Sequence, residues 1–354
     1  MPSSMRAAVY VGESRVAIQS VATPSIGRGE ILVRVESCGV CHTDLKKIEY
    51  NLLPPPRIYG HETAGFVAAV GEDVTKFKVG DRVVVFHHIP CGDCFYCQRR
   101  LYAQCKVYKR VGITAGYEPA GGGFSEYVRV MDWIVERGVE IIPAAVSFDQ
   151  ACWVEPVNTC FKGVEMLGLQ SEDVVAVLGQ GPIGLIFTLL IKRTGARILA
   201  TDTIAFRRDL SGQFGASAFD PRQDAFEEAV KAATDGRGAD AVVVATNARG
   251  LVEQALKISR PGAKILLFAQ TSVTERIEIA GSDICVGERV LLGSYSADVD
   301  LQAESARLVF SGELPLQQLI SDCVSLEDIN KGIQTALHPT ANSLKVVVHP
   351  QERH

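Results

Sequence analysis

The chain has 354 residues, of which 47% are hydrophobic and 22% are charged, a composition typical of an ordinary globular protein with room for two domains. Its net charge of -5 and its pI near 5.9 offer no basic surface for nucleic acid or for anionic lipid. We therefore expect its partners to be small molecules and copies of the same chain, with no nucleic acid and no membrane.

The first 20 residues contain no sustained apolar run after their basic residue, so no secretory signal is predicted. The longest apolar run, around residues 183–191, is too short to span a bilayer. These features predict a cytoplasmic protein. In a reducing compartment, the ten cysteines are better explained as metal ligands and buried thiols than as disulfides.

Short alternating stretches dominate the first part of the chain. Residues 5–36 contain AAVYVG, VAIQSVA and EILVRVES, which are separated by proline and glycine, and residues 64–85 continue the same pattern. Strand-like alternation bounded by turn residues predicts an antiparallel or barrel-like all-β arrangement.

Residues 38–65 place one thiol, one imidazole and one carboxylate close together in the sequence. The candidate ligands are Cys41, His61 and Glu62. A catalytic zinc takes three ligands of these kinds and keeps a fourth position for water or substrate. Thr43 and Asp44 follow the thiol directly, where outer polar groups orient such ligands. The stretch by itself also fits a loop in which Cys38 and Cys41 are buried thiols beside a surface His-Glu pair.

A family resemblance favours the metal site. The segment GHETAGFVAAVGEDV, residues 60–74, fits the zinc alcohol dehydrogenase signature of the medium-chain dehydrogenase/reductase superfamily, and CHTD, residues 41–44, resembles its first-ligand motif. The resemblance spans essentially the whole chain. It implies that Cys41 is the ligand and Cys38 a neighbour, that Thr43 takes the substrate proton, and that His42 contacts the cofactor pyrophosphate.

The resemblance also implies an α/β fold with two domains. A discontinuous GroES-like, β-rich catalytic domain would comprise residues 1–155 and 295–354. A doubly wound parallel Rossmann domain, residues 156–294, would bind the dinucleotide. In this family the dimer or tetramer forms through the last strands of the cofactor domain, here around RVLLGSY, so we expect a homodimer or homotetramer.

A second metal site is predicted by four cysteines in CGDCFYCQRRLYAQC. They are Cys91, Cys94, Cys97 and Cys105, separated by two, two and seven residues. Four thiolates this close in sequence can surround one zinc ion tetrahedrally and leave no open position. The family carries a structural zinc on a lobe with this spacing, here residues 91–105, so the expected total is two zinc ions per chain.

Glu155 is a further candidate at the catalytic metal. The adjacent Pro156 disfavours helical backbone at Glu155, so we expect the carboxylate to lie at a break between helical segments. In the polyol and threonine dehydrogenase branches, the glutamate of this Glu-Pro pair faces the catalytic zinc. The sequence leaves open whether Glu62 or Glu155 is the resting ligand.

The segment DVVAVLGQGPIGLIFTLLIKRTGARILATD reads as a buried strand, a glycine-rich turn, an apolar helix and a second strand. The turn residues predicted to bind the cofactor are Gly179, Gly181, Pro182, Ile183 and Gly184. Small residues there allow a pyrophosphate to approach the helix N-terminus. Asp202 ends the second strand, where an acid binds the ribose hydroxyls and repels a 2′-phosphate. NAD is therefore predicted over NADP, with Arg207 nearby as in NAD-using relatives.

Alternating helix and strand patterns continue to residue 294 and predict a parallel sheet. Among them, DAFEEAVKAATDGRG is an expected helix, AKILLFAQ an expected strand, and Pro261-Gly262 an expected turn before that strand. The last segment, residues 295–354, brings helical patterns and then the strand SLKVVVHP.

Together these features predict a zinc- and NAD-dependent dehydrogenase of secondary alcohols, with polyols or sugar derivatives as substrates. Zinc lowers the pKa of the substrate hydroxyl, and the nicotinamide takes the hydride. Two features bear on the substrate: the Glu155-Pro156 context, and Lys46 in place of the usual relay histidine. Lys46, Lys47 and Arg57 could bind a phosphate instead, so a phosphorylated polyol or an amino alcohol such as threonine is the alternative. A zinc- and NAD-binding redox sensor or scaffold without turnover is the alternative from another class.

Overall fold

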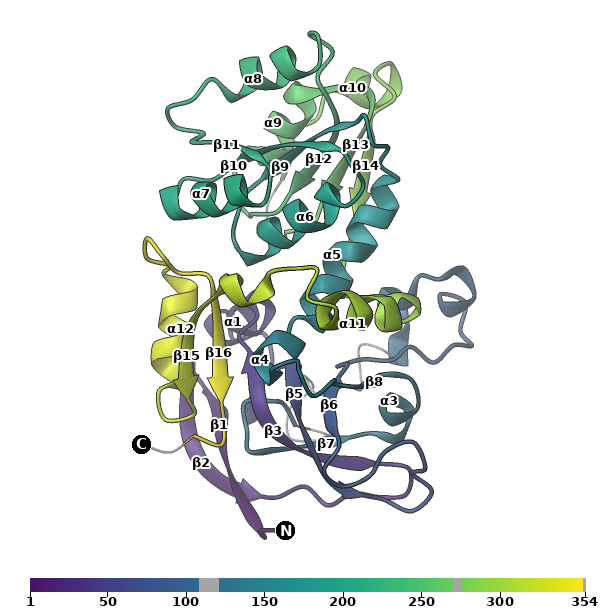
Figure 1. The fold of residues 1–354 in the computed structure, drawn as a ribbon, viewed down its shortest axis with the longest axis vertical. Coiled ribbons are helices and arrows are strands. Elements are labelled where there is room, and N and C mark those ends of the chain that lie inside the picture. Colours follow the sequence, from purple (N-terminus) through teal and green to yellow (C-terminus); the bar gives the residue numbers. More distant parts are fainter. Residues whose placement is uncertain (108–120, 270–275, 353–354) are drawn as a thin grey trace. The chain divides into compact units, whose positions relative to one another are not determined.

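The computed structural model describes residues 1–107, 121–269 and 276–352, and the chain divides into two compact units. The first unit comprises Met1–Asn158 and Asp298–His354, and the second comprises Thr159–Ala297 (Figure 1). Within the described ranges, none of the helices has the length and hydrophobicity that a bilayer-spanning segment needs.

The first unit is built mainly from antiparallel strands. Its strands are β1 Ser4–Gly12, β2 Arg15–Ala22, β3 Ile31–Gly39, β4 Arg57–Ile58, β5 Glu62–Val70, β6 Arg82–Val85, β7 Tyr127–Val130, β8 Val139–Ile141, β15 Ile320–Ser325 and β16 Lys345–His349. One sheet has the order β2-β1-β4, and the larger one has the order β15-β16-β3-β5-β6-β8, with β7 on β3. Because β16 pairs with β3, the last strand of the chain belongs to the same sheet as β3, β5 and β6.

The first unit also contains short helices. They are α1 His42–Glu49, α3 Asp132–Arg137, α4 Phe148–Ala151, α11 Gln302–Phe310 and α12 Ile329–Leu337. Strand β3 alternates over part of its length: Val33 and Val35 are fully buried, whereas Arg34 and Glu36 are half-buried. An alternating apolar face packed on a core is what holds an antiparallel sheet in register.

The second unit contains a six-stranded parallel sheet. Its strands are β9 Val174–Leu178, β10 Arg197–Thr201, β11 Ser217–Phe219, β12 Ala239–Val244, β13 Ser259–Leu267 and β14 Val290–Gly293. Their order is β11-β10-β9-β12-β13-β14, and every neighbouring pair is parallel. This is the 3-2-1-4-5-6 order of a doubly wound dinucleotide-binding fold, so the predicted fold class is confirmed.

Helices lie on both faces of the parallel sheet, with α6 and α7 on one side and α8, α9 and α10 on the other (Figure 1). They are α6 Pro182–Lys192, α7 Ala205–Gln213, α8 Phe226–Ala233, α9 Leu251–Ile258 and α10 Gly281–Cys285. Coverage on both faces explains why β9, with the sequence VVAVL, is buried at every position, because a strand covered on both sides needs no polar face.

Two local predictions were wrong. Helix α5 spans Val154–Leu167 and runs through Glu155 and Pro156, because a proline in the first helical turn costs no hydrogen bond. The break that we expected at Glu155 lies before it instead, between α4 and α5. Pro261-Gly262 forms no separate turn either, since β13 begins directly at Ser259. The irregular pairing with β12 between Ala239 and Ala241 absorbs the distortion there.

Candidate active site and metal centres

The first unit brings together the three predicted ligands of a catalytic metal. Donor atoms of Cys41, His61 and Glu62 all lie within 4.8 Å of one another. Cys41 is the residue before α1, and Glu62 begins β5, so the group forms where a helix start meets a strand start. Cys38 lies outside the group: it is fully buried on β3, and its thiol contacts the Thr63 hydroxyl at 3.6 Å.

A buried carboxylate orients the imidazole. Asp44, in the first turn of α1, is fully buried, and its Oδ1 lies 3.1 Å from Nδ1 of His61. Because a carboxylate can only accept, the Nδ1–H of His61 donates and Nε2 is left for a metal. Burial lowers the pKa of His61, but Asp44 and Cys41 outweigh it and raise that pKa well above its usual value. The donor set therefore attracts positive charge.

Lys345 is the partner of Glu62. Its Nζ forms an ion pair with Glu62 Oε2, and the side chains of Lys345 and Glu62 are 9% and 1% exposed. The ammonium also lies 5.3 Å from the ring centroid of Trp153. Burial lowers the pKa of Lys345, but Glu62 raises it overall. Glu62 is therefore shared between the donor group and a buried cation from β16.

Glu155 lies near the donor group of Cys41, His61 and Glu62. It is not one of the residues whose donor atoms all lie within 4.8 Å of one another. Its Oε1 is 3.8 Å from Nε2 of His87, and the His87 ring centroid is 5.1 Å from that of His61. Burial is the main cause that raises the pKa of Glu155 to about 7, while burial lowers the pKa of His87 well below its usual value. A carboxyl group that is easily neutralised thus faces a neutral imidazole.

The basic residues considered for an anionic substrate lie on neighbouring elements. Lys46 and Lys47 are in the last turn of α1, where a cation also complements the helix dipole, and Nζ of Lys47 lies 5.8 Å from the ring centroid of Tyr59. Arg57 donates to the carbonyl of Pro54 at 2.9 Å. Of the predicted residues on α1, His42 is exposed and Thr43 is half-buried.

The four cysteines of residues 91–105 form a compact cluster. The Sγ atoms of Cys94 and Cys97 are 3.5 Å apart, those of Cys91 and Cys105 are 3.6 Å apart, and those of Cys91 and Cys97 are 3.8 Å apart. Four sulfurs at a zinc–sulfur distance of about 2.3 Å around one ion are separated by about 3.8 Å. The cluster therefore has the dimensions of a closed tetrahedral zinc site, and it leaves no ligand position for a substrate.

In the second unit the glycine-rich turn connects β9 with α6. Gly179 has φ +95°, and a Cβ on Gly184 would lie 1.9 Å from the Gly179 carbonyl oxygen, so the helix can pack this closely only with glycine at 184. A Cβ on Gly181 would meet nothing closer than 3.7 Å. Gly181 is the residue before α6, and Pro182 opens that helix, followed by Ile183. The exposed amides of a helix start suit a phosphate.

Asp202 lies directly after β10, at the carboxyl end of the sheet. Its Oδ2 accepts from the backbone N–H of Gln180 at 2.7 Å, and its Oδ1 accepts from Ile204 N–H at 2.8 Å. Nη1 of Arg207 lies 4.0 Å from Oδ2. The carboxylate thus holds the glycine-rich turn in place, and its remaining lone pairs can still accept from a ribose.

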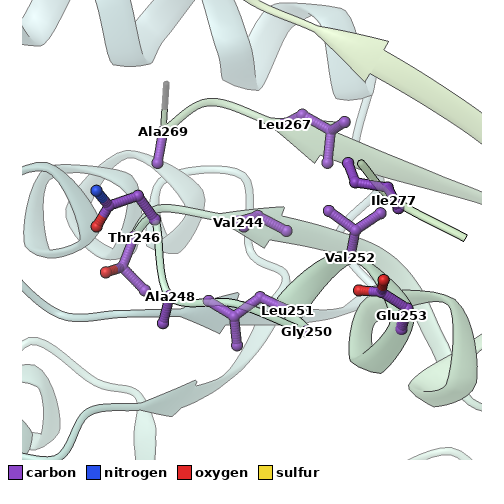
Figure 2. A pocket seen from close by; sticks show the side chains of 11 residues that line it. Val244, Thr246, Ala248, Gly250, Leu251, Val252, Glu253, Leu267, Ala269 and Ile277 are labelled. Atoms are coloured by element: carbon purple, nitrogen blue, oxygen red, sulfur yellow. The ribbon is translucent and has the colours of Figure 1, made fainter. Parts of the chain in front are cut away.

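A hollow lies beyond the carboxyl ends of β12 and β13 (Figure 2). It is lined by Val244, Thr246, Asn247, Ala248, Gly250, Leu251, Val252, Glu253, Leu267, Ala269 and Ile277. A Cβ on Gly179 would lie 2.9 Å from Thr246, so the hollow adjoins the glycine-rich turn. Doubly wound sheets bind their ligands outside these strand ends.

Comparisons with known proteins agree with this geometry. Residues 27–138 match the alcohol dehydrogenase GroES-like domain, and residues 182–310 match the zinc-binding dehydrogenase domain. The D-altritol 5-dehydrogenase of Agrobacterium fabrum is 31% identical over 337 residues, covering 92% of this chain and 94% of that protein. The chain belongs to the zinc-dependent alcohol dehydrogenase family. This confirms the predicted family, the reaction class and the dependence on zinc and a nicotinamide cofactor.

Two further relatives show how far the similarity extends. The sorbitol dehydrogenase of Bacillus subtilis is 29% identical over 358 residues, covering 99% of this chain and 98% of that protein. A solved structure from Sinorhizobium meliloti, described as a zinc-binding dehydrogenase bound to NADP, has a TM-score of 0.89 at 29% identity and covers 99% of this chain and 100% of that chain. This dehydrogenase therefore matches its relatives through both units.

Three residues of the dehydrogenase site were not assigned a role from the sequence. Lys345 comes from β16, far along the chain from Glu62, and only the pairing of β16 with β3 brings it near. His87 follows β6, and Trp153 precedes α5. The sequence signal for His87 was the pair of histidines just before the cysteine lobe; Lys345 and Trp153 carry no local signal.

The ion pair of Lys345 allows a direct test in this dehydrogenase. In protein treated with a chelator to remove zinc, the variant Lys345→Met is expected to lower the free energy of unfolding by about 3–5 kcal/mol relative to the wild type treated in the same way, because it leaves the Glu62 carboxylate buried without a cation. Urea denaturation of the purified protein measures this. The double variant K345M/E62Q should recover most of the loss, since the amide carries no charge. A loss below about 1 kcal/mol in the single variant would contradict a buried pair.

Proposed function

We propose that the protein oxidises a secondary alcohol, of the polyol or sugar-derivative class, to a ketone and transfers the hydride to NAD. The observation that carries this proposal is the approach of the Cys41, His61 and Glu62 donor atoms to within 4.8 Å of one another, with a second glutamate carboxylate, that of Glu155, nearby. Soft sulfur, imidazole nitrogen and carboxylate oxygen together are the donor set of a catalytic zinc. A zinc bound there supplies Lewis-acid polarisation of the substrate hydroxyl and lowers its pKa.

The residues around the donor group have separate tasks. Asp44 fixes the tautomer of His61, with its Oδ1 3.1 Å from Nδ1. Lys345 forms an ion pair with Glu62, so the Glu62 carboxylate is shared between this cation and the metal. Glu155 is therefore the proposed fourth protein group at the metal. Thr43, half-buried in the first turn of α1, accepts the substrate proton. Lys46, two residues after Asp44 and half-buried, takes the place of the relay histidine at the end of this proposed proton path.

We propose that the cofactor binds to the second unit with its pyrophosphate on the glycine-rich turn of residues 179–184 and its ribose on Asp202. Arg207 and His42 are the further proposed contacts. The NAD preference rests on the charge of Asp202, which disfavours a 2′-phosphate. Because a relative from Sinorhizobium meliloti was solved with NADP bound, the preference for NAD is the part of the proposal to test first.

For this test we choose Asp202→Asn, because the amide oxygen still accepts a backbone hydrogen bond while the charge is lost. We expect the KM for NAD to rise about tenfold and the ratio of NAD to NADP efficiency to fall by about 10–100-fold, which corresponds to about 1.4–2.7 kcal/mol. Steady-state kinetics with both cofactors measure this. Asp240→Asn is the matched control, since Asp240 lies at the amino end of β12 and should leave the ratio unchanged. An unchanged ratio in the Asp202 variant would refute the assignment.

The substrate class is tested with purified protein, NAD and a panel of sorbitol, other hexitols and pentitols, butanediol, L-threonine and a phosphorylated hexitol. The formation of reduced nicotinamide is followed with and without a chelator. Turnover of a polyol that is abolished by the chelator supports the proposal. Preferential turnover of L-threonine or of the phosphorylated hexitol would show that the substrate is an amino alcohol or a phosphorylated polyol instead. Zinc and NAD binding without turnover of any compound would favour a sensor or scaffold.

We propose that residues 1–155 and 295–354 act as the catalytic domain, residues 156–294 as the dinucleotide-binding domain, and that the protein works in the cytoplasm as a homodimer or homotetramer. Strand β14 supports the assembly proposal, because it lies at the edge of the six-stranded sheet and its Val290 is 43% exposed. An exposed edge strand can pair with a second copy. Sedimentation equilibrium tests this: a monomer at micromolar concentration would exclude it.

A further inference from the structure

A third group of metal-ligating side chains lies in the first unit, apart from the two groups described above. Donor atoms of Asp149, Cys323 and His349 all lie within 4.8 Å of one another. They come from three elements, α4, β15 and β16. No family signature singles them out in the sequence, where Asp149 and Cys323 are 174 positions apart.

The sheet explains why these residues meet. Strands β15 and β16 are parallel neighbours, with Cys323 opposite Val347 and Ser325 opposite His349. Since side chains alternate along a strand, Cys323 and His349 point to the same face of the sheet. The short helix α4 brings Asp149 to that face, where Ser37 of β3 donates to Asp149 Oδ1 at 2.5 Å. The backbone therefore holds all three donors in place.

The individual contacts resemble those of a metal ligand set. Nε2 of His349 lies 2.8 Å from Asp149 Oδ1, and Sγ of Cys323 lies 4.0 Å from Asp149 Oδ2. Donors around one zinc, at about 2.3 Å for sulfur and about 2.0–2.2 Å for nitrogen and oxygen, are separated by about 3.3–3.8 Å. Shifts of less than about 1 Å would bring the three donors to these separations.

A second carboxylate orients the imidazole. Nδ1 of His349 lies 3.0 Å from Oε1 of Glu352, so the Nδ1–H donates there and Nε2 points toward Asp149 and Cys323. A carboxylate behind the non-ligating nitrogen is the usual arrangement for a metal-binding histidine. An isolated ion pair between His349 and Asp149 would not need the Glu352 carboxylate, so the contact with Glu352 distinguishes this group from such a pair.

We propose that Asp149, Cys323 and His349 form a third metal site that binds Zn²⁺. A thiolate, an imidazole and a carboxylate are together a borderline-soft donor set, which favours Zn²⁺ over Mg²⁺ or Ca²⁺. Cys323 is exposed, so a water molecule completes the coordination. The ion links α4 to β15 and β16, and it binds by displacing the protons of the thiol and of His349 Nε2.

The test uses the reactivity of the Cys323 thiol in the full-length protein. Iodoacetamide labelling of each cysteine is followed by peptide mass spectrometry, with and without micromolar Zn²⁺ and again after EDTA. We expect Zn²⁺ to slow the labelling of Cys323 at least tenfold, since a metal-bound thiolate is not free to react, and EDTA to restore it. Cys285, an exposed thiol of α10, is the control whose rate should not change.

Two variants identify the other ligands. In His349→Ala and in Asp149→Asn, Zn²⁺ should protect Cys323 at least tenfold less than in the wild type; circular dichroism checks that each variant is folded. Independently, Cys323→Ser should contain one zinc ion fewer per chain than the wild type after equilibration with Zn²⁺. Labelling of Cys323 that is insensitive to Zn²⁺, or protection that persists in both variants, would overturn the proposal and leave a His-Asp ion pair. Neither readout depends on enzymatic turnover.

Discussion

Replacing Cys41 with serine is expected to lower kcat/KM by about 10³-fold and to remove one zinc ion per chain relative to the wild type. Sulfur is the softest donor in the group formed with His61 and Glu62, and the Lewis-acid contribution that depends on it amounts to several kcal/mol, with each 1.4 kcal/mol worth about tenfold in rate. Steady-state kinetics and metal analysis by mass spectrometry measure both effects.

Cys38 provides the matched control for this variant. It is only three positions away but fully buried on β3, and its thiol contacts Thr63 rather than the donor group. Cys38→Ala should retain the full zinc content and most of the activity. If C41S keeps its zinc and its turnover while C38A loses them, the ligand assignment is reversed; if both variants keep them, the group is no catalytic metal site.

The fold was predictable where the signal is local. The strand-turn-helix pattern of residues 174–192 contains its own evidence: a wholly apolar strand, glycines where the turn needs them, and a helix that starts at Pro182. The cysteine lobe is similar, because short spacings by themselves force four sulfurs together. In both cases the chemistry lies within one stretch of the sequence, and tertiary context adds little.

Other features depend on contacts that the sequence order hides. Lys345 pairs with Glu62 only because β16 adds to β3, and the Asp149, Cys323 and His349 group depends on the same strand and its parallel neighbour β15. The error at Pro156 has a different origin. Proline disfavours a helix interior but is tolerated in the first turn of a helix. The sequence did not show that α5 begins at Val154, which places Pro156 in its first turn.

The cysteine lobe leads to the largest expected effect on stability. In Cys97→Ser the zinc content should fall by one ion per chain and the free energy of unfolding by about 4 kcal/mol or more, because a structural zinc contributes its binding energy directly to folding. Cys97 is 5% exposed, and its sulfur lies 3.5 Å from that of Cys94 and 3.8 Å from that of Cys91, so no other side chain of the cluster can replace it. Chemical denaturation and metal analysis measure the two losses together.

The same variant separates the roles of the two predicted zinc sites. The four sulfurs leave no ligand position for a substrate, so C97S should keep a measurable turnover per folded molecule at low temperature. By contrast, C41S should show the loss in kcat/KM given above and be nearly as stable as the wild type. Cys160→Ala is the control for loss of a buried thiol, since Cys160 lies in α5 outside every metal-ligating group of the described residues. It should cost only about 1–2 kcal/mol and no zinc. A C97S variant with unchanged zinc content would show that the cluster consists of buried thiols without a metal.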